Sequence, residues 1–594
     1  MRFINIFLRF YIILLLCFLA NSWATSQNST SDGLIEKTVK YLASKELEGR
    51  RAGEKGDSLA AEYIRNQFNN AGLELFYDNG FQPFSLVSSV EIGSDNLLSF
   101  SDNNYVVTTD FLPYSFTANK QVSATVIFAG YGFSINEDSL QWNDYENVDV
   151  KGKWVLLLKG DPEIDKSESK FAAFSGNRAK VLTAQDNGAA GVLLVAGPRF
   201  SEKDELQGLF YDKNSSTYSI PVLQITRKVA DSILYKTGNT IGHLEDRINQ
   251  SMKPVVFQTD VVVSGKADVI QKTATTHNVV GILRGNDPAL NNEYIVVGAH
   301  YDHLGMGGPG SGSRALDTIA VHYGADDNAS GVAAIIEMAY KAAELKNNRR
   351  SLVFAAFGAE EMGLIGSTSF TANPPVDLTK VVAMFNFDMV GRLCPDNRSL
   401  SIGGSQTSLE TEEILNRLGN DFTLSLSPEG SGPSDHAAFY MQNIPVFFVS
   451  TGAHPDYHTP GDVPEKINYE GISEIVGYIL NVTSEVSNRD NALTFQESGS
   501  KMRRNRGGRL KVTLGVMPDF AGQEKSGLRI DAVTKGKPAS QAGMQKGDII
   551  TAINGYPVGN IYDYMNRLNT LEEGQTISID LMRDGKPQVL IVQL

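Results

Sequence analysis

Residues 277–486 alternate short apolar runs with longer amphipathic ones, and this alternation restricts the fold more than any other feature of the chain. The segment 329–345 has apolar residues at three- and four-residue spacing, which predicts a helix with one buried face. Four apolar runs have the length of strands: 294–299, 352–357, 381–387 and 445–449. Strands that alternate with helices predict an α/β fold with a mostly parallel sheet flanked by helices.

Residue types that bind metals follow these predicted strands or enter a predicted helix. They occur in five clusters, in the order His300-Tyr301-Asp302, Asp326-Asp327-Asn328, Glu360-Glu361, Asp388 and His458. In open α/β sheets, ligands bind outside the carboxyl ends of the strands. The five clusters are therefore expected to meet at one edge of the sheet.

The pairs of adjacent carboxylates are the strongest sign of a cation. Helix capping accounts for one acidic residue at Asp326-Asp327, but not for two. Glu360 and Glu361 directly follow an apolar run, where two buried carboxylates repel each other unless a cation lies between them. Imidazole and carboxylate ligands together suit zinc with positions left open for water.

The clusters together resemble the dizinc aminopeptidase family, whose relatives include glutamate carboxypeptidases. The resemblance also covers Leu47-Glu48-Gly49-Arg50, which is similar to the N-terminal segment of that family. It implies a zinc exopeptidase-like fold that binds two zinc ions. Two such ions, about 3.5–4 Å apart, hold a hydroxide and polarise the scissile carbonyl.

The resemblance also implies a role for each residue. His300 and Asp388 are expected to bind one zinc ion, Glu361 and His458 the other, and Asp326 is expected to bridge the two. Glu360 is expected to be the general base, Asp302 to orient His300, and Asp327 to support Asp326 without binding metal. His436 is expected to contact the substrate.

The function that follows is hydrolysis of N-terminal peptide bonds by an aminopeptidase. A glutamate-type carboxypeptidase on the same scaffold is the first alternative, with Arg314 and Arg392 as candidates for binding a substrate carboxylate. A glutaminyl cyclase is disfavoured, because the Asp326-Asp327-Asn328 cluster fits a two-metal site. A pseudoenzyme that only binds peptides remains a third alternative.

Other residues near the clusters are interpreted more conservatively. Ser434-Asp435-His436 is not read as a serine triad, because triad members seldom converge from consecutive positions. His303, His322 and His454 are expected to be loop or supporting residues, and His243 and His277 to be packing or surface residues. The Gly/Ser-rich segment 306–313 is interpreted as a loop that can flex over the site.

Two further modules are expected around the catalytic part. Residues 111–265 resemble a protease-associated domain, inserted between peptidase segments 32–110 and 270–488. Residues 489–507 are interpreted as a linker, and 508–594 closely resemble a PDZ domain. Leu514-Gly515-Val516 would receive the terminal carboxylate of a peptide by β-augmentation. The alternative is a degenerate groove that packs on the catalytic domain.

The N-terminus has the pattern of a signal peptide over residues 1–24. Arg2 and Arg9 precede the apolar run 10–20, and Ser22-Trp23-Ala24 offers small residues for cleavage. An uncleaved anchor remains an alternative, and lipidation at Cys17 is disfavoured. Export to the periplasm or the exterior of a bacterium is therefore expected, with no stable membrane span.

Charge and cysteine content narrow the partners further. The net charge of -15 argues against nucleic acid as a partner. After removal of the leader, Cys394 is the one cysteine left, so no intramolecular disulfide is expected. The expected partners are peptide substrates and a C-terminal peptide ligand of the PDZ domain.

Overall fold

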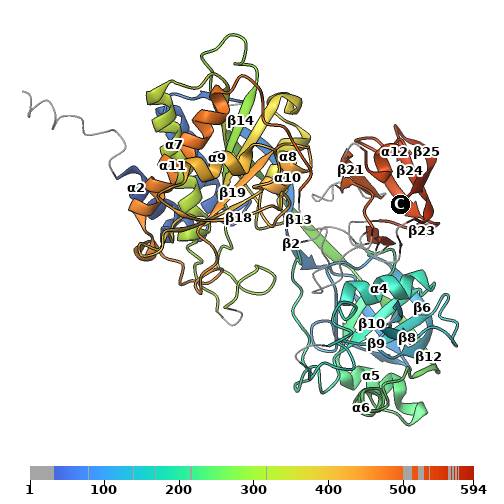
Figure 1. Ribbon diagram of the computed structural model, residues 1–594. Coiled ribbons are helices and arrows are strands. Elements are labelled where there is room, and N and C mark those ends of the chain that lie inside the picture. The colour runs from blue at the N-terminus through green and yellow to red at the C-terminus, as the bar shows by residue number, and fades with distance from the viewer. Residues whose placement is uncertain are drawn as a thin grey trace, which may run out of the picture.

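The computed structural model describes residues 33–498 and 512–594, apart from short gaps at 78, 138, 167–168, 214–216, 316–317, 519–526, 534–535, 560–562, 565–566, 569–570 and 573. The expected leader, residues 1–24, lies outside the described residues. Figure 1 shows three lobes, which correspond to the expected peptidase domain, the inserted protease-associated domain and the C-terminal PDZ domain, and these names are used for them below.

The peptidase domain is built on a nine-stranded mixed sheet with the order β1-β13-β15-β14-β16-β19-β17-β18, in which β2 also pairs with β13. The central pairs β15–β14, β14–β16 and β16–β19 are parallel, whereas β13 pairs antiparallel with β15. The strands are β1 (Glu74–Leu75), β2 (Phe81–Ile92), β13 (Val269–Leu283), β14 (Tyr294–His300), β15 (Ser351–Phe357), β16 (Val381–Phe387), β17 (Ser399–Gly403), β18 (Thr423–Ser427) and β19 (Val446–Ser450). This sheet confirms the α/β fold class.

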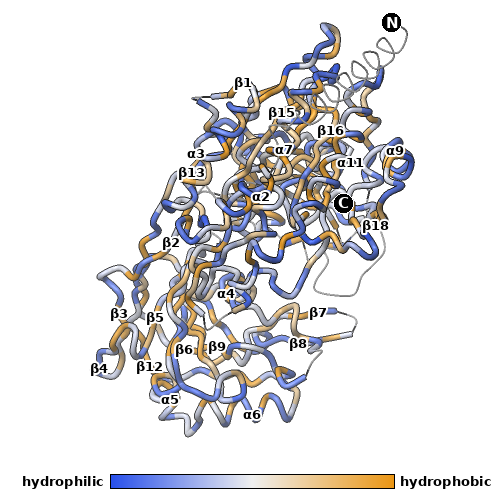
Figure 2. The backbone as a smooth tube through the Cα atoms, turned by 90° about the vertical axis from the view of Figure 1, so that its left-hand side faces the viewer, coloured by the Kyte–Doolittle hydropathy of each residue, from blue (hydrophilic) through white to orange (hydrophobic). Residues whose placement is uncertain are grey.

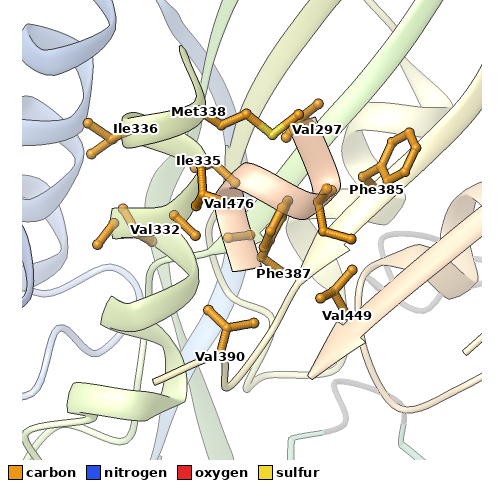
Figure 3. Close-up of a cluster of buried hydrophobic side chains, with 14 of the residues drawn as sticks. Val297, Val332, Ile335, Ile336, Met338, Phe385, Phe387, Val390, Val449 and Val476 are labelled. Atoms are coloured by element: carbon orange, nitrogen blue, oxygen red, sulfur yellow. The ribbon is translucent and has the colours of Figure 1, made fainter. Parts of the chain in front are cut away.

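Helices cover the sheet and bury its apolar side chains. They are α2 (Leu34–Leu42), α3 (Lys55–Asn70), α7 (Gly331–Leu345), α8 (Ile365–Ala372), α9 (Thr411–Leu418), α10 (His436–Tyr440) and α11 (Tyr469–Asn488). Figure 3 shows α7 placing Val332 and Ile335 beside Phe387 of β16 and Val476 of α11. β14, β15 and β16 are buried along their whole length, which is why their sequences are continuous apolar runs.

The N-terminal segment of the peptidase domain consists of two helices and a sharp turn between them. α2 and α3 are separate helices, with the short 3₁₀ turn η1 (Lys45–Leu47) between them. Glu48, Gly49 and Arg50 all have positive φ, so the chain turns sharply there. The turn brings the Arg50 side chain into the interior of the domain, where it is fully buried.

The protease-associated domain has its own eight-stranded sheet, in the order β4-β3-β12-β6-β9-β10-β11-β5. Its strands are β3 (Leu97–Phe100), β4 (Asn103–Asn104), β5 (Phe111–Pro113), β6 (Gln121–Ala129), β9 (Trp154–Leu158), β10 (Gly191–Val195), β11 (Val222–Ile225) and β12 (Val256–Lys266), with β7 (Ser134–Glu137) and β8 (Leu140–Asn143) as a separate hairpin. Its helices are α4 (Asn177–Asp186), α5 (Arg227–Leu234) and α6 (Ile241–Ser251). Figure 2 shows apolar stretches in β6 and β9, inside this lobe, and hydrophilic stretches on its outer loops.

The PDZ domain forms a smaller β-structure around a core of its own. Its sheet contains β20 (Val516–Pro518), β21 (Leu528–Val533), β22 (Ile549–Ile553), β23 (Tyr556–Pro557), β24 (Thr576–Arg583) and β25 (Lys586–Gln593), with the short helix α12 (Pro538–Gln541) beside them. β20 and β25 end the strand order β20-β21-β22-β24-β25. β20 is therefore an edge strand, the position at which β-augmentation takes place.

The protease-associated and PDZ domains are connected to the peptidase domain differently. The long strands β2 and β13 pair over much of their length and connect the peptidase domain with the protease-associated domain (Figure 1). Residues 489–498, expected to be linker, pack on the peptidase domain, where Leu493 enters the core and Phe495 contacts Tyr440. None of the helices among the described residues is long and apolar enough to cross a bilayer.

Candidate metal centre

The five predicted clusters meet at the carboxyl ends of the parallel strands. His300 is the last residue of β14, while Glu360 and Asp388 follow β15 and β16. Asp326 and Asp327 lie in the π-helical turn η3 (Ala325–Ser330) that precedes α7. His458 lies in the loop after β19. The parallel order of β15, β14, β16 and β19 thus brings distant positions of the sequence together.

One half of the centre consists of His300, Asp327 and Asp388. The Nε2 atom of His300 lies 3.2 Å from Oδ1 of Asp327 and 3.6 Å from Oδ1 of Asp388. The Nδ1 atom of the same ring lies 3.2 Å from the Asp302 carbonyl oxygen. A proton on Nδ1 satisfies that carbonyl and leaves the Nε2 lone pair facing the two carboxylates.

The other half has the same construction around His458. Its Nε2 atom lies 3.1 Å from Oδ2 of Asp327 and 3.3 Å from Oε1 of Glu361, while Nδ1 lies 3.0 Å from the Gly312 carbonyl oxygen. His303, expected to be a loop or supporting residue, also reaches this half. Its Nδ1 atom lies 2.9 Å from Oε1 of Glu361.

The carboxylate between the two histidines is Asp327, whereas Asp326 was expected in that position from the sequence. Adjacent side chains point in different directions, and here Asp326 turns away. Its Oδ1 atom accepts hydrogen bonds from the Gly391 amide and the Ser330 hydroxyl, and Oδ2 lies 3.2 Å from Nε2 of His454. Asp326 and Asp327 therefore have the opposite positions to those expected from the sequence.

Asp462 and Asn328 determine this local conformation. The Oδ2 atom of Asp462 accepts hydrogen bonds from the backbone amides of both Asp326 and Asp327, at 2.8 and 3.1 Å. The Asn328 side chain donates to the Phe387 carbonyl and accepts from the Gly331 amide. These contacts join η3 to the end of β16 and to the loop after β19.

Asp302 supports the acidic pair after β15. Its Oδ1 atom accepts a hydrogen bond from the Glu360 amide at 2.9 Å, and Oδ2 accepts one from the Glu361 amide at 3.3 Å. The contact of Asp302 with His300 is made mainly by its carbonyl oxygen, since its carboxylate is 3.8 Å from Nδ1. Asp302 thus connects the end of β14 to the end of β15.

Burial and mutual repulsion shape the electrostatics of the site. Burial raises the pKa of Glu360 well above its ordinary value, and the nearby Glu361, Asp435 and Asp388 add to the effect. Burial alone would lower the pKa of His458, but Asp327 and Glu361 raise it to about 10. The centre therefore collects more negative charge than its imidazoles offset, which favours a bound cation.

Arg50 lies behind the centre and holds backbone from several segments. Its guanidinium group donates to the carbonyl oxygens of Leu42, Tyr301, Tyr323 and Gly324, at 2.5 to 3.0 Å. Tyr301 follows His300, and Gly324 precedes η3. Arg50 belongs to the segment Leu47-Glu48-Gly49-Arg50 that resembles the family, but local sequence spacing gives no sign that its side chain contacts both ligand-bearing loops.

The Ser434-Asp435-His436 segment does not form a serine triad. The Ser434 hydroxyl donates to Oδ2 of Asp388 at 2.7 Å and so orients a candidate ligand. His436 starts α10 and stacks on Phe448, with ring centroids 4.5 Å apart. Burial lowers the pKa of His436 to about 3, so its ring is neutral. Its expected contact with substrate stays a prediction.

The two arginines considered as carboxylate-binding residues of a carboxypeptidase, Arg314 and Arg392, already have partners within the protein. Arg392 lies 3.0 Å from Asp462 and 3.4 Å from Asp456, so its charge is already offset. Arg314 is hydrogen-bonded to the Tyr457 carbonyl at 3.4 Å. The His322 ring lies nearby. It is hydrogen-bonded through Nε2 to the Ser313 hydroxyl and through Nδ1 to the Ala320 carbonyl oxygen.

The donor set fits two divalent cations. The candidate ligand atoms of His300, Asp327 and Asp388 lie within 4.8 Å of one another, as do those of His303, Asp327 and Glu361. Imidazole nitrogens that face carboxylate oxygens at 3.1 to 3.6 Å leave lone pairs opposed unless a proton or a metal ion lies between them. A mixed nitrogen and oxygen set of this kind suits zinc.

Comparison with known families decides what kind of domain carries this centre. Residues 278–483 match the model of peptidase family M28, residues 122–233 that of the PA domain and residues 501–594 that of the PDZ domain. This chain carries an M28 peptidase domain. The M28 match contains all the candidate ligands, and the protein is a hydrolase of the metallo-aminopeptidase type.

Several proteins to which this chain is similar are aminopeptidases. An aminopeptidase of Pseudomonas aeruginosa is 26% identical over 419 residues, which cover 68% of this chain and 67% of that protein. Leucine aminopeptidase 2 of Trichophyton rubrum is 27% identical over 285 residues, 41% of this chain and 54% of its own length. The solved structure of BSAP, a zinc aminopeptidase from Bacillus subtilis, is similar with a TM-score of 0.46 and 22% identity, over 77% of this chain and 95% of that one.

Proposed function

We propose that the protein is a zinc aminopeptidase that holds two ions, with Asp327 shared between them. The position of Asp327 carries this proposal, because its two oxygens lie 3.2 and 3.1 Å from Nε2 of His300 and of His458. One ion would be held by His300 and Asp388, and the other by His458 and Glu361. Asp327 replaces Asp326 as the proposed bridging ligand.

Bound zinc would act as a Lewis acid toward the scissile carbonyl and lower the pKa of water. Residues of the chain would carry out the proton transfer. Glu360 would accept a proton from the attacking water and deliver it to the nitrogen of the leaving amine. Its buried carboxyl has a raised pKa, which makes it a stronger base once ionised. The Asp302 carboxylate would hold Glu360 in place by accepting a hydrogen bond from the Glu360 backbone amide.

The first test is mass spectrometry of an unblocked peptide of mixed sequence, incubated with the zinc-loaded protein with and without a chelator. Stepwise loss of residues from the N-terminus, abolished by the chelator, is expected. Loss from the C-terminus would replace the proposal with the carboxypeptidase alternative. Absence of cleavage by protein that holds two zinc ions would overturn it.

Export is the second part of the proposal and rests on the sequence pattern of residues 1–24. The apolar run and the small residues at Ser22 and Ala24 support cleavage by a signal peptidase. Mass measurement of the protein recovered from periplasm and medium should give a chain that starts after Ala24. Full-length protein retained in the cytoplasm would contradict export.

A further inference from the structure

A segment of the protease-associated domain reaches the glycine-rich loop of the metal centre. This segment, residues 209–213, lies against loop residues 306–313 of the peptidase domain. The point where a Cβ on Gly310 would lie is 2.8 Å from Cδ2 of Phe210 and 2.8 Å from the Tyr211 carbonyl oxygen. Glycine at position 310 thus lets the two backbones approach closely.

Both domains hold this segment in place. The Tyr211 ring is buried in a cluster with Ala359, Met362 and Ile365, directly beside Glu360 and Glu361. The next residue, Asp212, accepts two hydrogen bonds from Arg178 of α4, at 2.7 and 3.0 Å. Since consecutive residues are anchored in different domains, the position of the following residue is fixed.

That following residue is Lys213, and its ammonium group lies beside Gly312, in the loop that contacts His458. The Nζ atom is 2.8 Å from the point where a Cβ on Gly312 would lie, and Nδ1 of His458 is 3.8 Å from the same point. The Gly312 carbonyl is also the hydrogen-bond acceptor of His458. Lys213 lines a small pocket together with His303, Ser311 and Glu361.

The positive charge of Lys213 is available for a ligand. Among the described residues, no carboxylate lies within ion-pair distance of its Nζ atom, and loop residues 306–313 contain no ionisable side chain. Arg51, the other strong cation of the pocket, donates to the Ser88 carbonyl and lies 3.9 Å from Glu54. Lys213 is half-buried, so its charge is less screened than that of a surface lysine.

We propose that Lys213 is a specificity-determining residue that binds a carboxylate of the peptide substrate. The inference rests on the proposed peptidase function and adds a preference to it. The carboxylate has two possible sources, the C-terminus of a short peptide or an acidic side chain near the scissile bond. A charge-assisted hydrogen bond donated by Nζ would bind a carboxylate from either source.

Four substrates distinguish these sources. Zinc-loaded wild type and Lys213→Met are compared on Leu-Ala, Leu-Ala-amide, Leu-Glu-amide and Leu-Gln-amide. The substitution should lower kcat/KM about tenfold to a hundredfold for the peptide with the recognised carboxylate, mainly through KM. A selective loss on Leu-Ala identifies the C-terminus, and one on Leu-Glu-amide identifies the side chain.

A binding measurement separates this inference from catalysis. In the Glu360→Gln background, calorimetry should show tighter binding of the peptide with the recognised carboxylate than of its uncharged partner. Adding Lys213→Met should remove that preference, and Lys213→Arg should keep it. If wild type cleaves none of the four peptides, the proposed function has failed, and the calorimetric preference still decides the role of Lys213.

The matched control is Lys203→Met, because Lys203 belongs to the same domain, is highly exposed and lies 3.9 Å from Glu205. It should leave every rate unchanged. An equal loss on all four substrates in Lys213→Met, or loss of zinc from that variant, would overturn the inference and leave Lys213 with a structural role. Unchanged preference in both measurements would overturn it as well.

Discussion

The two accessory domains contact the peptidase domain in contrasting ways. The protease-associated domain buries Tyr211 beside the acidic pair of the metal centre and places Lys213 next to His458. The PDZ domain makes polar contacts at the periphery. Lys546 donates to the Ala372 carbonyl at 3.1 Å, Lys537 lies 2.8 Å from Glu497, and Arg567 pairs with Asp186 of the protease-associated domain.

The difference concerns what each domain contributes to the site. A buried aromatic ring excludes water and has one arrangement, whereas the partly or fully exposed contacts of Lys537 and Lys546 contribute little to stability. The Arg567–Asp186 pair is largely buried, but it joins the PDZ domain to the protease-associated domain and not to the metal centre. The protease-associated domain is therefore expected to affect substrate binding directly. The PDZ domain is expected to affect where the enzyme acts and which protein it meets, with little influence on turnover of small peptides.

The largest loss of activity should come from a substitution in the metal centre, and the substitutions in the two accessory domains are compared with it. Asp327→Ala removes the carboxylate that lies between His300 and His458 and should abolish stoichiometric zinc binding, because the remaining carboxylates lose their shared cation. Activity should fall by roughly three orders of magnitude or more. Zinc content by mass spectrometry checks this, and Asp326→Asn, expected to keep both ions, is the matched comparison.

Glu360→Gln should lower kcat by roughly two to four orders of magnitude while it keeps both zinc ions, because the variant lacks a general base but retains the candidate ligands. Steady-state kinetics and metal analysis of the same sample provide the measurement. Turnover at the wild-type rate would exclude Glu360 as the base.

Tyr211→Ala should be the most damaging substitution in the accessory domains. Removing a buried aromatic ring leaves a cavity that costs about 3–5 kcal/mol, and it frees the 209–213 segment from Ala359 and Met362. We expect kcat/KM for Leu-Ala to fall about tenfold or more with zinc content unchanged. Chemical denaturation followed by fluorescence, together with kinetics, measures both effects.

Gly310→Ala should weaken substrate binding less than Tyr211→Ala. Its added methyl group would meet Phe210 and the Tyr211 carbonyl at 2.8 Å, which forces the 209–213 segment away from the loop. Gly72→Ala is the control, because Gly72 has a similar positive φ of 83° and no atom within 4 Å of the added Cβ. A rise in KM shared by both variants would show backbone strain and not segment displacement.

Arg567→Gln should have the smallest effect on catalysis. It removes the ion pair between the PDZ domain and Asp186, which is distant in the sequence from every candidate ligand. We expect kcat/KM for Leu-Ala to stay within about twofold and the radius of gyration by small-angle scattering to increase. A large loss of activity would contradict the contrast between the two domains.

Local sequence pattern predicted the fold well because the strands are buried on both faces. The runs 352–357 and 381–387 coincide with β15 and β16 to within one residue, and the helix expected over 329–345 coincides with α7 apart from its first two residues. The edge at which the clusters meet also followed from the parallel order. These features depend on residues that are neighbours in the sequence.

The assignments that differ depend on contacts between distant residues. Asp327 and not Asp326 lies between the histidines because Asp462, more than a hundred positions away, holds both of their amides. His303 reaches Glu361 through a loop whose course no local pattern determines. Lys213 was overlooked because it belongs to a different domain from the centre that it approaches.

The contacts of Arg50 imply that the inserted domain folds before the metal centre is assembled. It precedes the whole insertion, and two of its acceptors, Tyr301 and Tyr323, lie 251 and 273 residues further along the chain. The loop between donor and acceptors must close before the ligand-bearing turns are held, and closing it costs entropy that grows with the length of disordered chain. A folded insertion shortens that loop to the pair β2 and β13. Damage far from the zinc ligands, inside the insertion, would therefore delay assembly of the centre even where the finished enzyme is unchanged.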